Sequence, residues 1–380
     1  MELPVGYFNF HNDKFMNYQL NRWYSLGYTR KEDIERAGAS IKTFADYVAV
    51  FTQLGDEAAA QNRLKNAAFY YRAAEFLVEP ADANKLPLYK KFSDLFYEAF
   101  ADEDIERQKV PYAGSYLPAM VLAPRSEYGR KKGTIVAFGG FDSFIEEFYC
   151  MWVSLAEAGY EVIAFEGPGQ GAALREYDLP FDHAWEKPTG AILDYFEVSD
   201  ATLVGVSMGG YWAIRAAAFD KRIQRVVAFP PVYDWMELAG GISHGTVDFL
   251  MKWRGMMNFM VKMKMANGKL KHTVNQALFI TQKEQPIDVV DWLLGMNKDF
   301  LHSELIDQDV LLLGGEHDAF QPPKLVVKQE AALVNAKSVT TRIFTQAEHA
   351  DQHCQMGNLG LVLETIAAWI AHKKPVAVGA

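Results

Sequence analysis

Residues 203–218 read LVGVSMGGYWAIRAAA, and they contain the most informative turn of this 380-residue chain. The first residues are small or β-branched and apolar, as in a buried strand, and a helical pattern starts directly after the glycine pair. Between the two, Ser207 occupies the centre of a G-x-S-x-G pattern whose glycines relieve crowding around a sharp turn. The pattern predicts that the turn presents Ser207 as a nucleophile, and the alternative is a buried turn serine.

Short apolar strands alternate with helical patterns on both sides of this stretch. The strands end in glycines or prolines, as in GTIVAFGGFDS (133–143), EVIAFEGPGQG (161–171), IQRVVAFPPVYD (223–234) and DVLLLGGEHDAFQPP (309–323). Fully apolar strands separated by helices are typical of a parallel sheet that helices cover on both faces. The sequence therefore predicts the α/β class, with a mostly parallel central sheet flanked by helices.

The alternation divides the chain into four segments. Residues 1–106 show only amphipathic helical patterns and are predicted to form an N-terminal helical domain. Residues 107–234 and 306–380 form the two parts of the α/β core, and the methionine-rich residues 235–305 form a helical cap insertion. This insertion is either an adaptable apolar lid or ordinary core. We expect it to pack with the N-terminal domain over the carboxyl edge of the sheet, where ligands bind in such folds.

Composition excludes several classes of function. The chain has 38 Lys and Arg against 48 Asp and Glu, a net charge of −10, which argues against a nucleic-acid or anionic-membrane surface. Two cysteines, Cys150 and Cys354, indicate no disulfide framework, and neither a signal peptide nor a membrane-spanning stretch is recognisable. Residues 167–171, GPGQG, lack the features of a phosphate loop. We expect a cytoplasmic protein that needs no metal ion and no cofactor.

A nucleophilic serine needs a base, and the base needs an acid that orients it. In the chain order that belongs to this type of turn, the acid follows the serine and the histidine comes last. Asp318 follows a late strand and is the candidate acid, with Glu316 as a less well placed competitor. His349 and His353 both follow the last strand, and their spacing does not choose between them.

A developing oxyanion needs two backbone donors. Met208, directly after the serine, supplies one, and Phe141 after an earlier strand is the candidate for the second, with Gly140 behind it. Glu146 and Glu147 follow at the start of a predicted helix. They are either first-turn residues that compensate the helix dipole, or one of them faces the cleft to donate a proton or position a substrate.

Five segments carry a resemblance to a known group when they are taken in order: GGFDSFIEEFY (139–149), FEGPGQG (165–171), GVSMGG (205–210), GGEHD (314–318) and DQHCQMGN (351–358). Together they resemble α/β-hydrolases of the 2,6-dihydroxypseudooxynicotine hydrolase and fermentation-respiration switch protein type. They are also similar to the fungal yellowish-green pigment hydrolases, which shorten polyketides. The resemblance covers about residues 60–375 and implies the α/β-hydrolase fold.

The resemblance also implies roles for individual residues. The base of those relatives precedes a cysteine, which matches His353 rather than His349, and the nucleophile and acid match Ser207 and Asp318. An acidic residue in the segment that contains Glu146 and Glu147 is implicated in carbon–carbon bond hydrolysis. The resemblance further implies a homodimer.

These observations predict a serine-dependent hydrolase that cleaves a carbon–carbon bond next to a ketone. Its substrate is expected to be a small aromatic or apolar carbonyl compound such as an aryl ketone, a β-diketone or a polyketide-like molecule. A carboxylesterase or lactonase that acts on a small ester is the first alternative. A binding protein that lacks activity on the same scaffold is the second.

Overall fold

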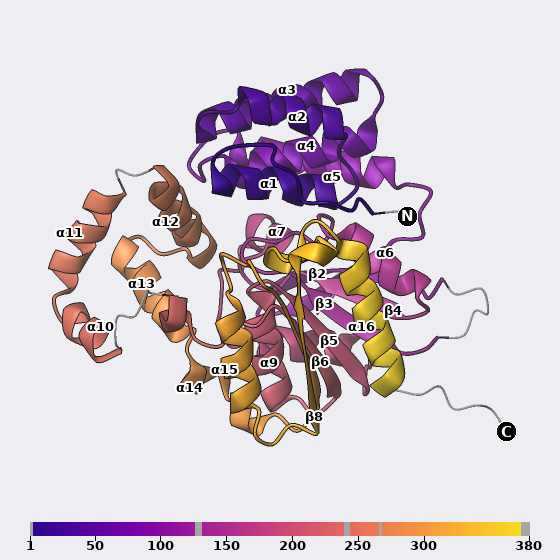
Figure 1. The fold of residues 1–380 in the computed structure, drawn as a ribbon, viewed down its shortest axis with the longest axis vertical. Coiled ribbons are helices and arrows are strands. Elements are labelled where there is room, and N and C mark those ends of the chain that lie inside the picture. Colours follow the sequence, from indigo (N-terminus) through magenta and orange to yellow (C-terminus); the bar gives the residue numbers. More distant parts are fainter. Residues whose placement is uncertain (1–2, 126–130, 239–243, 266–267, 374–380) are drawn as a thin grey trace.

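The computed structural model describes residues 3–125, 131–238, 244–265 and 268–373. Figure 1 shows a central sheet with helices on both sides, a layer of helices above it and a second helical group beside it. The predicted fold class is confirmed by this arrangement. No helix within the described ranges is both long and apolar enough to cross a membrane.

The sheet contains eight strands in the order β1-β2-β4-β3-β5-β6-β7-β8. The six strands from β4 to β8 in this order pair in parallel, and β1 and β2 form an antiparallel hairpin at one edge. The strands span Glu106–Tyr112 (β1), Ser115–Leu122 (β2), Thr134–Phe138 (β3), Glu161–Phe165 (β4), Ala201–Val206 (β5), Ile223–Phe229 (β6), Asp309–Gly315 (β7) and Ser338–Phe344 (β8).

Both faces of the parallel part are buried, which explains the unbroken apolar runs of its strands. In β3, Ile135 and Ala137 belong to one core cluster and Val136 and Phe138 to the other, because successive side chains point to opposite faces. The helices that cover the two faces are α6 (Tyr149–Glu157) and α16 (Leu359–Lys373) on one, and α8 (Glu186–Tyr195), α9 (Gly209–Phe219) and α15 (Pro323–Ala332) on the other.

The N-terminal helices form a layer that packs on the sheet as part of the same core. One apolar cluster runs from Trp23 and Phe69 in this layer to Trp152 in α6 and Val206 at the end of β5. The helices are α1 (Lys14–Ser25), α2 (Lys31–Ser40), α3 (Phe44–Ala60), α4 (Leu64–Leu77) and α5 (Lys85–Ala99). In Figure 1 this layer lies above the sheet, next to the short helix α7 (Gly171–Arg175).

The helical cap lies between β6 and β7 in sequence and beside the sheet in Figure 1. Its elements are η1 (Trp235–Leu238), α10 (His244–Met251), α11 (Arg254–Lys264), α12 (Gly268–Thr281), α13 (Pro286–Gly295), α14 (Lys298–Leu301) and η2 (Ser303–Leu305). The hydroxyl of Tyr211 in α9 donates to the carbonyl of Asn297 at 2.7 Å, which ties the cap to the core. In Figure 1, α10 and α11 lie on the outer side of the cap.

Candidate active site

Ser207 lies in the turn between β5 and α9, and its backbone has a φ of +60°. A non-glycine residue in this region is uncommon and is held there only by its surroundings. The Ser207 amide donates to the Phe229 carbonyl at 2.6 Å. A Cβ added at Gly205 would lie 2.0 Å from the Gly209 carbonyl oxygen, so the strand and the helix can meet this closely only with glycine. The local geometry explains the glycines that surround the serine.

Ser207, His353 and Asp318 form a chain of hydrogen bonds across the ends of three strands. The distance from Ser207 Oγ to His353 Nε2 is 2.9 Å, and that from His353 Nδ1 to Asp318 Oδ2 is 2.8 Å. The three side chains follow β5, β8 and β7, whose carboxyl ends meet at one edge because the strands are parallel. The structure thus brings together the three residues predicted as nucleophile, base and acid.

The remaining candidates for acid and base point elsewhere. Asp318 is buried, and its Oδ1 accepts hydrogen bonds of 2.8 Å from the amides of Phe320 and Gln321. Glu316 instead accepts from the Gln346 amide at 2.7 Å. His349 is exposed and ends a short 3-10 turn. Of the two histidines, His353 is therefore the one that lies between an acid and the serine.

His353 is buried against aromatic side chains. Burial is the largest single influence and disfavours the charged imidazole, but the charge and hydrogen bond of Asp318 together with those of the adjacent Cys354 outweigh it, and the pKa of His353 is raised above its usual value near 6.5. The rings of Tyr18 and Phe320 lie 6.0 and 5.1 Å from the imidazole, centre to centre, and the Tyr18 hydroxyl donates to the His353 carbonyl at 3.3 Å. Tyr18 belongs to α1, so the N-terminal layer forms part of the histidine's surroundings.

The loop after β3 lies directly against the serine turn. A Cβ added at Gly140 would be 2.9 Å from the Met208 amide nitrogen, so the loop that carries Phe141 approaches the other predicted donor closely. Gln170 holds this loop, because its Nε2 donates to the carbonyls of Gly139 and Gly140 at 2.8 Å each. This role of Gln170 was not predicted from the sequence. The available signal was the position of a glutamine between Gly169 and Gly171 in the turn after a buried strand.

Glu146 and Glu147 lie in turns before α6, which begins at Tyr149, rather than in the first turn of that helix. Both carboxyls meet side chains of the N-terminal layer. The Tyr97 hydroxyl donates to Glu146 at 2.7 Å, and burial raises the pKa of Glu146. Contacts with another layer therefore account for these two residues better than compensation of a helix dipole.

Glu147 is fully buried, and both of its carboxylate oxygens are occupied by arginines. Arg22 Nε donates to one oxygen and Arg72 Nε to the other, at 2.9 Å each. These contacts leave Glu147 poorly suited to donate a proton to a substrate.

The two arginines belong to a larger buried ion network that joins the N-terminal layer to the loop after β3. Glu75 pairs with Arg72, with Lys85 at 3.0 Å and with Arg175 at 2.8 Å. Arg175 then holds the Asp142 carboxylate at 2.8 and 3.0 Å. We use the name buried ion network for Arg22, Arg72, Glu75, Lys85, Asp142, Glu147 and Arg175.

The cap reaches this network through α12, where the Phe279 ring lies against Arg175 and Lys85. Gln276 in α12 is buried and donates a short hydrogen bond to the Asp142 carboxylate. Asp142 directly follows Phe141 and has a φ of +46°. All three parts of the chain therefore meet at the residue beside the predicted oxyanion donor.

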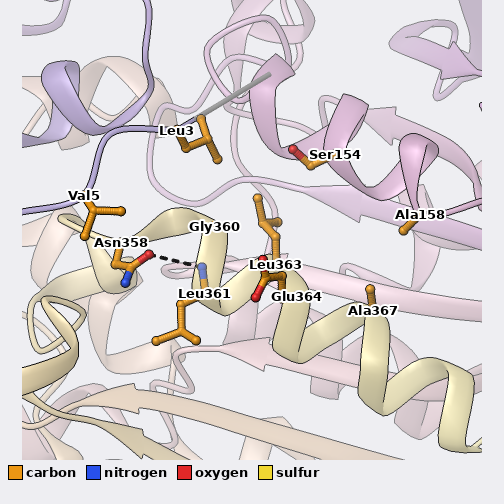
Figure 2. Close-up of a pocket in the computed structure, with 10 residues that line it drawn as sticks. All are labelled: Leu3, Val5, Ser154, Ala158, Asn358, Gly360, Leu361, Leu363, Glu364 and Ala367. Carbon is orange, nitrogen blue, oxygen red and sulfur yellow. Dashed lines mark hydrogen bonds between the residues drawn. The ribbon is translucent and has the colours of Figure 1, made fainter.

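A separate pocket opens on another side of the molecule, with a volume of about 520 Å³ (Figure 2). It is lined by Leu3 and Val5 of the N-terminal segment, by Ser154 of α6 and Ala158 just after it, and by residues between Asn358 and Ala367 in the first part of α16. It includes none of the predicted site residues. Within the described ranges, His, Cys, Asp and Glu side chains form no group of three or more that could hold a metal ion.

Comparison with known proteins agrees with the fold. The model of the alpha/beta hydrolase family matches residues 136–347, more than half of the chain. Hydrolyase ccsE of Aspergillus clavatus is 31% identical over 264 residues, which cover 63% of this chain and 59% of that protein. Hydrolyase poxO of Penicillium oxalicum is 26% identical over 82% of this chain and 81% of its own. The matched region spans only 59%, 49% and 56% of the first three curated relatives.

Two solved structures share the fold over most of their length. The structure titled 2,6-dihydroxy-pseudo-oxynicotine hydrolase superimposes with a TM-score of 0.65 at 18% identity, covering 94% of this chain and 98% of that one. The protein titled AbyA5 gives a TM-score of 0.67 at 18% identity, covering 90% and 89%. The serine turn, the parallel sheet and the match of the family model lead to one conclusion: the chain belongs to the alpha/beta hydrolase family.

Proposed function

We propose that this protein is a serine hydrolase that cleaves a carbon–carbon bond next to a ketone in a small, apolar carbonyl compound. Ser207 is the nucleophile, His353 the base and Asp318 the acid that orients it. The observation that carries the proposal is the hydrogen-bonded chain Ser207 Oγ–His353 Nε2 and His353 Nδ1–Asp318 Oδ2, at 2.9 and 2.8 Å. A nucleophile within reach of a base that a third group holds is the arrangement that acyl transfer requires.

In the first step His353 Nε2 takes the hydroxyl proton as Ser207 Oγ attacks the substrate carbonyl. Asp318 accepts from Nδ1–H and stabilises the imidazolium that forms. The negative charge that develops on the carbonyl oxygen is held by the amides of Met208 and Phe141, and one such donor contributes about 3 kcal/mol to lowering the barrier. Gln170 supports this step as a positioning residue, because it orients the carbonyls next to the Phe141 amide.

The second step breaks the bond between the carbonyl carbon and the adjacent carbon. The electron pair moves to the leaving carbon, which an aryl or second carbonyl group stabilises, and His353 returns the proton to it. The acyl group stays on Ser207 until water, activated by the same histidine, releases it as a carboxylic acid. Since both oxygens of Glu147 are occupied by arginines, we assign proton delivery to His353.

Carbon–carbon cleavage is preferred to ester hydrolysis because of the resemblance of residues 139–149 and 351–358 to hydrolases of that chemistry. The same three residues also suit an ester, whose alcohol leaves more readily. A carboxylesterase or lactonase is therefore the second candidate. A matched pair of substrates, a β-diketone and an ester with the same acyl group, distinguishes them by the ratio of their kcat/KM values.

The first experiment labels the protein with a fluorophosphonate probe and maps the modified peptide. We expect the label on Ser207, and we expect Ser207→Ala and His353→Ala to abolish labelling and to lower turnover by roughly 10⁴-fold or more. Ser154→Ala, which removes a half-buried hydroxyl that donates to the Cys150 carbonyl in the pocket that includes none of the predicted site residues, is the matched control. Turnover by Ser207→Ala at the wild-type rate would rule the proposal out.

The pH profile tests the base. Activity requires neutral His353, and Asp318 raises the pKa of this residue, so kcat/KM should increase with pH along a limb whose midpoint lies above 6.5. In Asp318→Asn the charge that favours the imidazolium is gone, so the midpoint should move to lower pH while activity falls. A wild-type midpoint well below 6.5 contradicts the assignment.

A further inference from the structure

The outer part of the cap exposes several large apolar side chains. Within the described residues, α11 has no buried side chain. Large apolar side chains along α10, the following turn and α11 are 43–64% exposed: Phe249, Trp253, Met256, Phe259, Met260 and Met263. We call these six residues the cap patch. Large apolar side chains grouped in this way on a surface are typical of an interaction site.

The patch lies on one side of its helix. Trp253, Met256, Met260 and Met263 follow each other at intervals of three and four residues, which places them on the same helical face. The opposite side of α11 makes polar contacts with the start of α13, where Asn258 and Lys262 donate to Gln285 at 3.0 and 2.9 Å. The apolar face is therefore directed away from the rest of the cap.

The charge around the patch is opposite to that of the whole protein. Residues 244–283 contain seven Lys and Arg and one Asp, a net charge of +6, in a chain whose net charge is −10. Lys252 lies between Phe249 and Trp253, Lys264 directly follows Met263, and both lysines are exposed. The whole cap, residues 235–305, has eight Lys and Arg against seven Asp and Glu, so the positive charge is confined to the segment that carries the patch, and the net charge of the chain hides it. The partner of the patch should consequently be anionic.

We propose that the cap patch binds a membrane surface that contains anionic lipids. The aromatic and methionine side chains enter the boundary between headgroups and acyl chains, and the lysines beside them meet the lipid phosphates and carboxylates. A helix with aromatic residues on one face and basic residues at its borders suits this environment. In a symmetric dimer through the patch, the same basic segments of two copies would lie against each other, which is unfavourable. This proposal does not depend on the reaction that the active site catalyses.

The test measures partition of the purified full-length protein onto sedimented vesicles. One vesicle type is phosphatidylcholine with 30% phosphatidylserine, and the other is phosphatidylcholine alone. The apolar variant is Phe259→Ser with Met263→Ser, and the charge variant is Lys252→Gln with Lys264→Gln. Val327→Ser in α15, which removes a side chain that is 62% exposed elsewhere, is the matched control.

We expect the wild type and Val327→Ser to bind vesicles with phosphatidylserine and to bind neutral vesicles at least tenfold more weakly. Each double variant should bind the vesicles with phosphatidylserine about tenfold or more weakly than the wild type does. The binding of the wild type should also weaken with added salt. The charge variant keeps the test decisive if the apolar variant fails to fold. Equal binding to both vesicle types, no binding, or unaltered binding by a folded double variant overturns the proposal. A concentration-dependent dimer that the apolar variant abolishes, with no lipid binding, assigns the patch to a second copy.

Discussion

Two helical regions cover the molecule beside its active-site edge, and they are attached in different ways. The N-terminal layer shares an apolar core with the sheet and is joined to it by the buried ion network. The inner part of the cap also shares an apolar core with the sheet, through Trp292, Met296 and Leu301, and hydrogen bonds such as those of Tyr211 and Gln276 add to this contact, but its outer helix α11 has no buried residue.

This difference indicates that the N-terminal layer supports the structure around the predicted site, whereas the outer part of the cap is an adaptable cover. The N-terminal layer contributes Tyr18 beside His353, and Arg72 donates to the Asp142 carbonyl at 2.9 Å in the loop that carries the predicted oxyanion donor Phe141. Removing this layer would disturb the catalytic geometry itself. The cap instead carries exposed methionines, whose flexible side chains adapt to different partners. We expect substrate and surface specificity to reside in the cap and catalytic geometry to depend on the N-terminal layer.

The largest expected effect comes from breaking the ion network. Glu147→Ala leaves Arg22 and Arg72 buried without their shared carboxylate, and we expect a loss of about 3–5 kcal/mol in the free energy of unfolding. Urea unfolding followed by circular dichroism measures it. Arg254→Ala removes the exposed ion pairs of α11 with Asp288 and Asp291 and should leave the midpoint unchanged within error. Equal decreases in the free energy of unfolding for the two substitutions would show that the two regions do not differ in this way.

The second prediction concerns the dependence of stability on pH. Burial, together with the nearby Glu146, raises the pKa of Glu166 to about 8. The folded state therefore binds this proton more tightly than the unfolded chain, so the contribution to stability is complete below about pH 4.5 and is lost as pH rises through about 8. Over this window we expect the free energy of unfolding to fall by on the order of a few kcal/mol.

Urea titrations of the wild type and Glu166→Gln at pH 5 and pH 9 measure this contribution. The variant should show a smaller decrease between the two pH values, whatever its absolute stability. Glu364→Gln changes an exposed carboxylate on α16 and should keep the wild-type decrease. If Glu166→Gln also keeps it, the buried carboxyl is not the source of the dependence.

The smallest effect is expected at the contact between the cap and the loop that carries Phe141, the predicted oxyanion donor. Gln276→Ala removes a hydrogen bond to Asp142, whose carboxylate keeps its two bonds from Arg175. The free energy of unfolding should therefore decrease by about 1 kcal/mol. We expect a decrease of a few fold in kcat with little change in KM. Gln282→Ala, an exposed glutamine just after α12, is the control. An increase in KM alone would show that Gln276 acts on substrate binding rather than on the loop.

Much of the candidate site was predictable because it depends on short-range patterns. The turn at Ser207 and the strand before Asp318 combine apolar runs with glycines, and such patterns predict both the element and its end. The choice between His349 and His353 was not predictable from spacing, because both lie in an irregular loop. Contacts from distant segments, including Tyr18 and Phe320, surround only one of them.

The contacts of Glu146 and Glu147 also could not be predicted from the sequence. Two acids before an apolar helix match a first turn, and no local pattern reveals that their partners lie in α1, α4 and α5. Gln170 is similar, since its role depends on two carbonyls about 30 positions earlier in the chain. Long-range partners such as these leave no periodic signal.

The sequence by itself determined the alternation of strands and helices, the serine turn, the parallel sheet and the set of candidate residues, because each follows from side-chain period and backbone sterics over a few neighbouring positions. The resemblance of the sequence to known hydrolases already indicated His353, and only the tertiary structure decided where the two glutamates point and which face of the cap stays exposed. Those outcomes depend on pairing charges and apolar surfaces between segments that lie far apart in the chain, and the free energy of that pairing is known only when the segments have come together.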